Sequence, residues 1–402
     1  MIQTLSRASL MLFGLFGVSV LVSKSGFTIL YSLVLIYGLF QFPWRDLAQR
    51  SWLEKYMMLL FPLAVLVNFF SVGGSIAAVD VLTRWTWPLI YFPIAHLHRN
   101  RNHRLIFFKG LAIGLAIACL YSYIRFYREF DLQYDGRIRV ASFWDILRWA
   151  YFCATAVTLL FSILIKTNFL GKKIWKIIFI LFVMTLVSLV LTSSRGAWVG
   201  ALVGMFCALI SQRKSLKYYL GYGILVCLLV MTSGGVRDRI FSIFKVERHG
   251  TQITSEDGSN AGRLHMWKVA LDLYQEVPLF GVGFKNSKPA LDEYLSRQSS
   301  DYVKTYTSVE YSYNDQHSSY MTLLLQFGGI YFLIIYGFFL VVTYRARREE
   351  IYIPSLICSF AVFFFYSAIA SFEAVIIFSL ISFLILNISC FQDSALDLIQ
   401  TS

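Results

Sequence analysis

Residues 177–210 read IIFILFVMTLVSLVLTSSRGAWVGALVGMFCALI, and this stretch decides the fold class. Two apolar runs, Ile177–Val190 and Ala197–Ile210, are joined by a short polar segment in which Arg195 is the one charged residue. Lysines and arginines cluster just beyond both ends of the stretch. Because a helix satisfies its own backbone polar groups in lipid, two such runs around a tight connection predict a pair of membrane-spanning helices.

The composition of the whole chain points the same way. Of its 402 residues, 57% are hydrophobic and only 15% are charged, whereas a soluble domain typically has about 25% charged residues. So little polar surface could not cover so many apolar side chains in water. The net charge of +13 does not indicate nucleic-acid binding, because the basic residues form short clusters between apolar runs. We expect the chain to lie among membrane lipids and to bind no nucleic acid.

Apolar windows recur along the chain and predict about twelve transmembrane helices. The first six runs are Leu10–Val22, Phe27–Phe42, Tyr56–Phe70, Val81–Leu97, Leu105–Ile124 and Trp149–Ile165. The other six are Ile177–Val190, Ala197–Ile210, Tyr218–Thr232, Ser318–Val342, Ile353–Ser371 and Ala374–Cys390. The predicted fold is therefore an all-α polytopic membrane protein.

The positions of lysine and arginine predict the orientation of these spans. Basic clusters occupy alternate connections, from residues 45–55 near the start to residues 345–348 near the end. Since short cytoplasmic loops carry an excess of Lys and Arg, we expect these connections and both termini in the cytoplasm. Two longer connections, about Arg125–Trp144 and Ser233–His317, then lie on the opposite, outer side.

This layout divides the chain into three regions. Residues 1–232 hold spans 1–9, residues 233–317 form one large outer loop with amphipathic helices, and residues 318–402 hold spans 10–12 and a cytoplasmic tail. The large loop is long enough for a small structured cap over the membrane. Its positive and negative charges are similar in number. Because the excess of Lys and Arg in cytoplasmic loops applies only to short loops, the basic residues of this long loop are compatible with an outer location.

The shorter outer loop carries arginines on the side where short loops avoid cations. They are Arg125, Arg128, Arg137 and Arg139. In one interpretation they form exposed ion pairs of little energetic value with acidic residues of the same loop. Those acidic residues are Glu129, Asp131 and Asp135. In the other interpretation the arginines form an anion-binding site at the outer membrane surface, and both stay open.

Arg195 lies in the segment Thr192-Ser193-Ser194-Arg195-Gly196-Ala197-Trp198, at the predicted outer edge of the bilayer. A guanidinium near lipid is costly and is a candidate functional group for that reason. The alternative is that the side chain only extends to the interface. Flanking serines and glycine let backbone or ligand approach closely, so we favour the functional interpretation.

Arg263 lies in the large loop, in the segment Asn260-Ala261-Gly262-Arg263-Leu264-His265-Met266-Trp267. Asn260 is a plausible N-cap for a helix that ends before Pro278 and the Gly281-Val282-Gly283 turn. The expected apolar face consists of Leu264, Trp267, Leu271 and Tyr274, as in an amphipathic helix on a membrane surface. Arg263 is either a solvated residue or part of an anion site at the start of the helix.

His317 begins the tenth predicted span, where the large loop re-enters the membrane. Imidazole takes up a proton near neutral pH, so His317 is a candidate general base, with Asp315 as a possible supporting residue. A lone histidine at the start of a helix is more often only interfacial, and this alternative is kept.

Further charged residues share the predicted outer face. Asp80 and Arg84 are four residues apart, and Asp145 and Arg148 are three apart, so each pair can meet along one helix. Glu373 lies between the last two spans. Its position makes it another possible supporting residue.

Several motifs are absent from the sequence. There is no GxxxxGK[ST] phosphate-binding loop, and no His, Cys and carboxylate cluster has the spacing of metal ligands. We therefore expect neither a cofactor nor a metal. Arginine side chains match the oxygens of phosphate groups, so a phosphorylated lipid is the expected ligand of the outer arginines.

The chain resembles the O-antigen ligase family of bacterial inner membranes, which includes O-antigen polymerases and some protein oligosaccharyltransferases. The resemblance rests on Ser194-Arg195-Gly196-Ala197-Trp198, on Gly262-Arg263, on Pro278-x-x-Gly281-x-Gly283 and on His317 at the start of a span. These motifs cover roughly residues 190–330. Their order and spacing carry the resemblance more than any single motif.

The resemblance implies a glycan donor carried on undecaprenyl diphosphate, in the periplasmic leaflet of the inner membrane. A ligase passes this glycan to a hydroxyl of the lipid A–core oligosaccharide, with inversion and without metal. Arg195, Arg263 and His317 match the family's essential arginines and histidine. Arg84 and either Arg137 or Arg139 would help to bind the diphosphate.

Ser318 stands where the family often has asparagine, which leaves a role for that amide open. The Phe372-Glu373 pair is also similar to some ligases. The first alternative is a polymerase that uses the same donor. The second is a membrane transporter or flippase, disfavoured because the chain shows no repeated halves and its polar residues gather at one face.

Overall fold

The computed structural model describes residues 2–45, 52–133, 138–166, 171–214, 216–231, 246–249, 252–255, 259–306, 317–345, 351 and 353–363. The last predicted span, Ala374–Cys390, lies outside these residues. So do the candidate site residues Arg137, Asp315 and Glu373.

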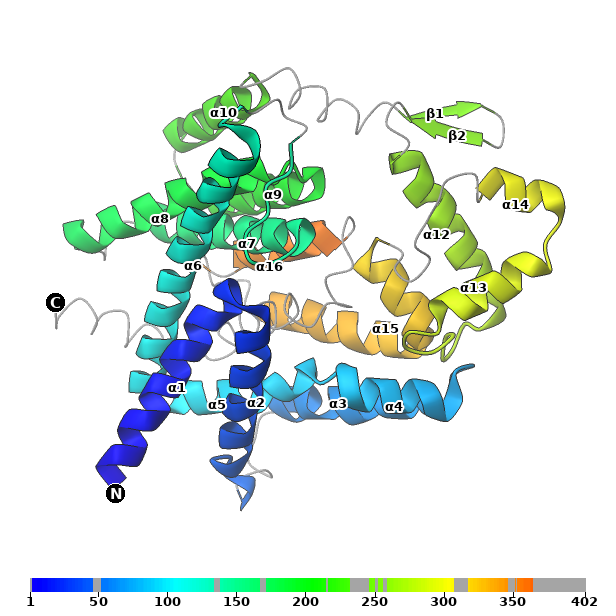
Figure 1. Cartoon of the computed structure of the whole chain (residues 1–402), viewed down its shortest axis with the longest axis horizontal. Coiled ribbons are helices and arrows are strands. Elements are labelled where there is room, and N and C mark those ends of the chain that lie inside the picture. Colours follow the sequence, from blue (N-terminus) through cyan, green and yellow to red (C-terminus); the bar gives the residue numbers. More distant parts are fainter. Residues whose placement is uncertain are drawn as a thin grey trace.

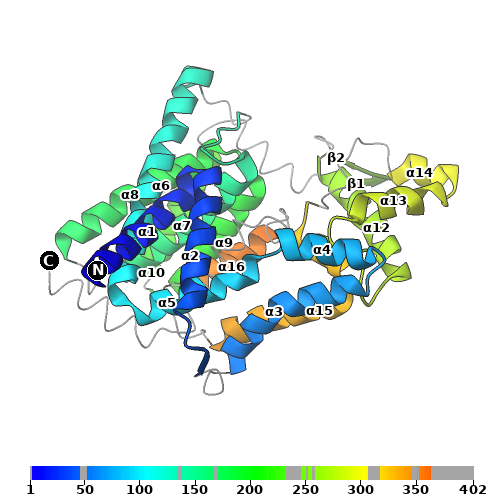
Figure 2. The ribbon, with the colours of Figure 1, turned by 60° about the horizontal axis from the view of Figure 1, so that its bottom comes forward.

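Most of the described residues form a bundle of apolar helices. Its first part consists of α1 (Ile2–Val22), α2 (Lys24–Phe40), α3 (Trp52–Phe69), α4 (Gly74–Arg84), the 3-10 helix η2 (Trp87–Ile90), α5 (Tyr91–Arg99) and α6 (Arg101–Phe130). Its second part consists of α7 (Ile146–Ile165), α8 (Lys172–Leu191), α9 (Arg195–Ser211), α10 (Leu216–Met231), α15 (Ser319–Arg345) and α16 (Ile353–Phe363). Figure 2 shows α3, α4 and α15 side by side in one part of the bundle.

A smaller unit, here called the cap, lies at one end of the bundle (Figure 1). It consists of the strands β1 (Val246–His249) and β2 (Gln252–Ser255) and the helices α12 (Ser259–Glu276), α13 (Ser287–Ser296) and α14 (Ser300–Tyr306). The strands pair antiparallel, with Val246 opposite Ser255. The described residues of the large loop predicted from the sequence therefore form helices and one short pair of strands, which the all-α prediction did not include.

The prediction of a membrane protein is confirmed. Among the described residues, four helices are long and apolar enough to cross a bilayer: Arg101–Phe130, Ile146–Ile165, Lys172–Leu191 and Ser319–Tyr344. Shorter apolar helices surround them, and large apolar side chains such as Leu333 (70% exposed) and Ile29 (62% exposed) point outward. Such surfaces suit lipid rather than water. The number of about twelve spans stays a prediction.

Glycines allow a close helix contact between α1 and α6. A Cβ atom at Gly110 would overlap the carbonyl oxygen of Gly14, and one at Gly114 would lie 2.7 Å from the carbonyl oxygen of Val18. The two backbones therefore touch directly, as is common where membrane helices associate through small residues.

Two predicted spans are not continuous helices. The fourth, Val81–Leu97, is divided among α4, η2 and α5, with Pro88 and Pro93 in the divided region. Proline lacks the N–H that a continuous helix needs, and this accounts for the break. The tenth span is broken at Gly328 (φ 71°, ψ 176°), and Figure 1 shows the two segments of α15 running in different directions.

The break in α15 is stabilised by the turn that follows α12. The N–H groups of Val282 and Gly283 donate to the carbonyl oxygens of Leu325 and Gln326, at 2.9 and 3.0 Å, and the Gly329 N–H donates to Pro278 at 2.8 Å. These bonds replace helix bonds that are lost at the break. The Pro278-x-x-Gly281-x-Gly283 motif thus connects the cap to the bundle.

The face of α12 predicted to be apolar is not the buried one. Helix α12 begins at Ser259, so Asn260 lies inside it rather than at its N-cap. Its buried side chains include Met266, Val269 and Leu273. Val269 and Leu273 pack with α13, α15 and the turn before α13. The predicted face was wrong because these neighbours cover a different side of the helix, and α12 packs in the cap instead of on a free surface.

Candidate active site

Arg195 is the first residue of α9 and follows a tight turn after α8. Ser193 has a left-handed backbone (φ 48°), which few residues other than glycine adopt. Ser194 is extended and begins the helix without a capping bond from its own side chain. The Trp198 indole N–H donates to the carbonyl oxygen of Leu189, at 3.0 Å, and ties the first turn of α9 to α8. The half-buried Arg195 side chain therefore starts from a constrained backbone.

The segment that carries Arg139 lies against this turn. The Ser193 hydroxyl donates to the carbonyl oxygen of Ile138, at 2.6 Å. On the other side of Arg139, the Val140 N–H donates to the carbonyl oxygen of Leu191, at 2.9 Å. Arg139 is exposed between these two contacts. The structure therefore brings together the backbones of two predicted site residues, Arg139 and Arg195.

A second pair of residues near this segment has a helix-capping role. Asp145 caps α7 by accepting from the Arg148 N–H, at 3.1 Å, and its carboxylate pairs with the Arg148 guanidinium, also at 3.1 Å. The guanidinium carbon lies 5.8 Å from the centre of the Trp144 ring. The predicted Asp145–Arg148 pair is confirmed, and the contacts of Asp145 are those of an N-cap.

His317 precedes α15 and also has a left-handed backbone (φ 48°). The residues after it are tied to the end of α16. The Ser318 hydroxyl lies 3.4 Å from the carbonyl oxygen of Phe363, and the Tyr320 hydroxyl donates to that of Phe360, at 3.0 Å. Helix α16 thus holds the start of α15.

The same end of α16 packs on α9. A Cβ atom at Gly200 would overlap the side chain of Val362, and one at Gly204 would lie 2.8 Å from the Cβ atom of Cys358. Gly200 is little more than one turn after Arg195, and Val362 adjoins the Phe363 carbonyl that faces Ser318. Helix α16 therefore brings Arg195 and His317 to the same end of the bundle.

Arg263 lies in a different unit, near the start of α12 in the cap, where its side chain is half-buried. The opposite end of α12 contacts the bundle, because a Cβ atom at Gly329 would lie 2.7 Å from the Tyr274 hydroxyl. Tyr274 is eleven positions after Arg263 in the helix, a rise of about 16 Å. The cap therefore presents Arg263 from a helix end far from its anchor on α15.

Arg84 ends α4 and pairs with Asp80, with the guanidinium Nε and a carboxylate oxygen 3.4 Å apart. This predicted pair is confirmed. Lys285 lies beside it and was not identified from the sequence as a site residue. The sequence places Lys285 directly after the Gly281-Val282-Gly283 turn, which could have indicated that it lies near the predicted site. No local pattern connects Lys285 with Arg84.

Arg125, predicted in the shorter outer loop, lies in the last part of α6 and has an ion-pair partner there. Arg125 donates to both carboxylate oxygens of Glu129, at 2.7 and 3.1 Å. This supports the ion-pair interpretation for Arg125. It does not extend to Arg139, whose segment contacts the turn before Arg195.

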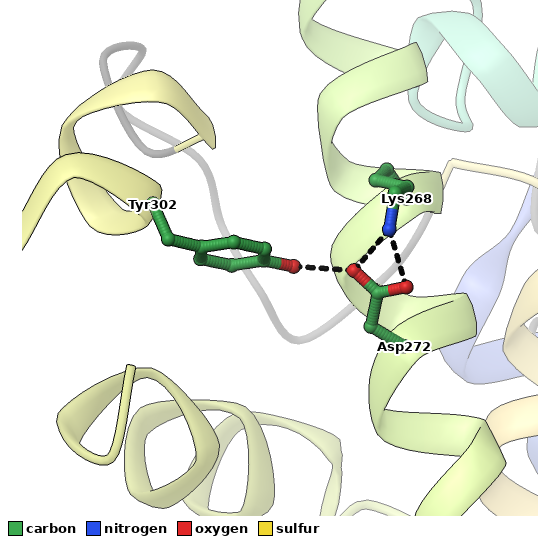
Figure 3. Close-up of polar contacts among 3 residues, drawn as sticks. All are labelled: Lys268, Asp272 and Tyr302. Atoms are coloured by element: carbon green, nitrogen blue, oxygen red, sulfur yellow. Dashed lines mark hydrogen bonds and ion pairs between the residues drawn. The ribbon is translucent and has the colours of Figure 1, made fainter. Parts of the chain in front are cut away.

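The cap contains a polar network of three residues (Figure 3). Lys268 and Asp272 of α12 lie 2.5 Å apart, and the Tyr302 hydroxyl of α14 donates to the Asp272 carboxylate, at 2.6 Å. Burial and this bond raise the pKa of Tyr302, so its hydroxyl stays protonated and donates. The network holds α14 against α12.

Comparison with known families identifies one part of the chain. Residues 177–336 match the model of the O-antigen ligase family. The match includes Arg195, Arg263, His317 and the Pro278–Gly283 motif. No curated protein matches the chain. The resemblance expected from the sequence is therefore confirmed over residues 177–336, which match the O-antigen ligase family.

Proposed function

We propose that this protein transfers a glycan from undecaprenyl diphosphate to a hydroxyl of the lipid A–core oligosaccharide. The reaction would take place at the periplasmic face of a bacterial inner membrane, with inversion and without metal. The observation that carries the proposal is the contact between the Arg139 segment and the turn before Arg195, which lies in the region that matches O-antigen ligases.

Two arginines at one turn suit a diphosphate. A guanidinium presents several N–H donors in a plane and can bind two phosphate oxygens at once. The backbone bonds on both sides of Arg139 and the constrained start of α9 hold the two residues before the substrate arrives. Such preorganised donors stabilise negative charge as it develops on a leaving group. Arg139 and Arg195 would therefore bind the donor diphosphate.

His317 would act on the acceptor. The acceptor oxygen attacks the anomeric carbon from the face opposite the diphosphate, and the bond from this carbon to the diphosphate oxygen breaks. The electron pair of that bond leaves with undecaprenyl diphosphate, and the acceptor proton passes to the imidazole of His317. The bonds between the start of α15 and the end of α16 hold the backbone next to His317, which supports this role of the histidine.

Arg263 would approach from the cap side. Helix α12 is anchored to α15 at its other end, which leaves Arg263 on the end away from the anchor. A third guanidinium here would add to the charge that faces the diphosphate. In this proposal Arg137, which lies two residues before Arg139 in the sequence, is a further arginine that would bind the diphosphate.

The test is reconstitution of the purified full chain with glycan-linked undecaprenyl diphosphate and lipid A–core, in the presence of a chelator. Products are separated on gels and identified by mass spectrometry. Glycan on lipid A–core supports the proposal, and loss of that product in His317→Ala supports the role of the histidine. A donor that lengthens on its own carrier would instead make the protein a polymerase. Binding of the donor without either product would overturn the proposal.

A further inference from the structure

We propose that Arg84 and Lys285 form a second phosphate site, which binds a phosphate group of the lipid acceptor. The identity of the acceptor rests on the proposed function. The existence of a second site rests on the structure alone. It differs from the sequence-based expectation that Arg84 binds the donor diphosphate together with Arg195, which stays a prediction.

Lys285 is held by the turn that connects the cap to the bundle. The Gly73 N–H donates to Val282, at 3.0 Å, and the Phe284 N–H donates to the side-chain oxygen of Asn68, at 2.6 Å. Lys285 itself has a left-handed backbone (φ 61°), which is uncommon for a residue with a side chain. The position of Lys285 is therefore determined by bonds to two other elements, and its side chain is exposed at the surface.

Arg84 ends α4, and the residue after it packs against this turn. The ring of Trp85, the next residue, packs on the ring of Phe284, with centroids 5.3 Å apart. The Lys285 ammonium lies 5.9 Å from the centre of the same Phe284 ring. Partial burial and the charge of Arg84 lower the pKa of Lys285, and Asp80 raises it. The charges of Arg84 and Lys285 thus act on each other.

The charges at this point do not balance. Among the described residues, Arg84 and Lys285 face one carboxylate, that of Asp80, which already pairs with Arg84. Holding like charges together in a fixed turn is unfavourable, and a bound anion would relieve it. A phosphate group has enough oxygens to accept from both side chains.

Exposed apolar side chains beside the two cations indicate a lipid. Helix α4 exposes Ile76 (76%), Val79 (57%) and Leu82 (49%). An amphiphile could place its acyl chains along these side chains and its phosphate between Arg84 and Lys285. Free phosphate could bind the two cations but would make no contact with the apolar side chains.

The site is separate from His317. The Trp85 ring packs on the ring of Phe327, with centroids 4.7 Å apart, and Phe327 is the last residue before the break in α15. His317 lies before the first residue of the same helical segment, Ser319. Nine helical residues span about 13 Å. One lipid could bind at Arg84 while the diphosphate of another is held at the Arg195 end.

The first test uses binding alone. The full chain in detergent is mixed with phosphorylated lipid A–core, with its dephosphorylated form, or with inorganic phosphate, and bound ligand is measured by native mass spectrometry. We expect the phosphorylated lipid to bind best, and Arg84→Gln and Lys285→Gln to weaken its binding about tenfold each. The matched control is Lys288→Ala, an exposed lysine of α13 three residues from Lys285.

Three results would overturn the inference. The dephosphorylated lipid could bind as well as the phosphorylated one, the control could weaken binding as much as Lys285→Gln, or inorganic phosphate could bind as tightly as the lipid. The conservative variant Lys285→Arg should keep binding. If it keeps binding while Lys285→Gln loses it, general misfolding of the turn is not the cause.

The second test separates this site from the proposed function. In the transfer assay, Lys285→Gln should raise the KM for the acceptor about tenfold and leave the KM for the donor unchanged. A rise in the donor KM would place Arg84 and Lys285 in the donor site and refute the inference. If the wild-type protein transfers nothing, the proposed function fails, and the binding test still decides whether the second site exists.

Discussion

The Ser193 hydroxyl donates a hydrogen bond to the carbonyl oxygen of Ile138, at 2.6 Å, across 55 residues of sequence. Each partner is close in sequence to an arginine: Ser193 lies two residues before Arg195, and Ile138 lies directly before Arg139. The bond therefore holds together the two backbone segments whose arginines we assign to the donor diphosphate.

Loss of this bond should disturb the site without removing either arginine. Ser193→Ala leaves the Ile138 carbonyl without its side-chain donor, and we expect the transfer rate to fall about tenfold, or about 1.4 kcal/mol in the barrier. The control is Ser194→Ala, because the Ser194 side chain makes no capping bond. Equal rates for the two variants would show that the bond does not position the site.

Removal of a guanidinium should have a larger effect. A preorganised donor to developing charge is worth about 2.7–4 kcal/mol, so Arg195→Ala should slow transfer at least about a hundredfold. Arg195→Lys should recover only part of the rate, because an ammonium cannot form the same planar pair of bonds. Arg128→Ala, at an exposed arginine of α6, serves as the control. Near-normal turnover of Arg195→Ala at normal expression would remove Arg195 from the site.

The break in α15 should not tolerate a side chain. A Cβ atom at Gly328 would overlap the carbonyl oxygen of Leu279, and the left-handed φ of 71° adds strain. We expect Gly328→Ala to destabilise the protein by at least about 1–3 kcal/mol, seen as a lower Tm. In the same helix, Gly337 has open space around it. Gly337→Ala should therefore be neutral or stabilising, and a similar loss in both variants would contradict the role of the break.

The contact between α14 and α12 can be tested at Tyr302. Tyr302→Phe keeps the ring but removes the hydroxyl that donates to Asp272 (Figure 3). We expect a loss of about 1–3 kcal/mol, because the carboxylate loses a donor in a partly buried place. Hydrogen exchange of the α14 amides measures this opening. Tyr306→Phe, whose ring packs on Tyr302 at 4.7 Å, is the control; unchanged α14 exchange in Tyr302→Phe would show that the bond contributes nothing.

The stability of the cap should depend on pH through His265. This side chain is 5% exposed, and its ring nitrogens have no hydrogen-bond partner among the described residues. Burial lowers its pKa below the ordinary value of 6.5. The unfolded chain then binds more protons than the folded one, so the cap loses stability as the pH falls below about 6.5.

Hydrogen exchange of the α12 amides between about pH 7.5 and pH 5 measures this effect. His265→Phe has no titratable group and keeps a ring next to Tyr306. It should flatten the dependence on pH. Parallel curves for the variant and the wild-type protein would exclude His265 as the cause.

Much of this protein follows from local sequence. The apolar runs around Arg195 predict helices on both sides of it, because each helix satisfies its own backbone in lipid. The Asp80–Arg84 and Asp145–Arg148 pairs were predictable for a similar reason, since residues three or four apart meet on any helix. The prolines in the fourth predicted span could have indicated that this span is divided. We predicted one continuous span because the segment is mostly apolar.

Tertiary structure alone decided the rest. The buried face of α12 depends on which neighbours cover it, and its own periodicity does not contain that information. The same holds for Ile138 with Ser193, for the Pro278–Gly283 turn with Gly328, and for Arg84 with Lys285. Each joins segments that are far apart in the chain, and these contacts form only when packed helices bring the segments together. Local patterns determined the helices and their capping pairs, whereas long-range packing determined which charged residues meet.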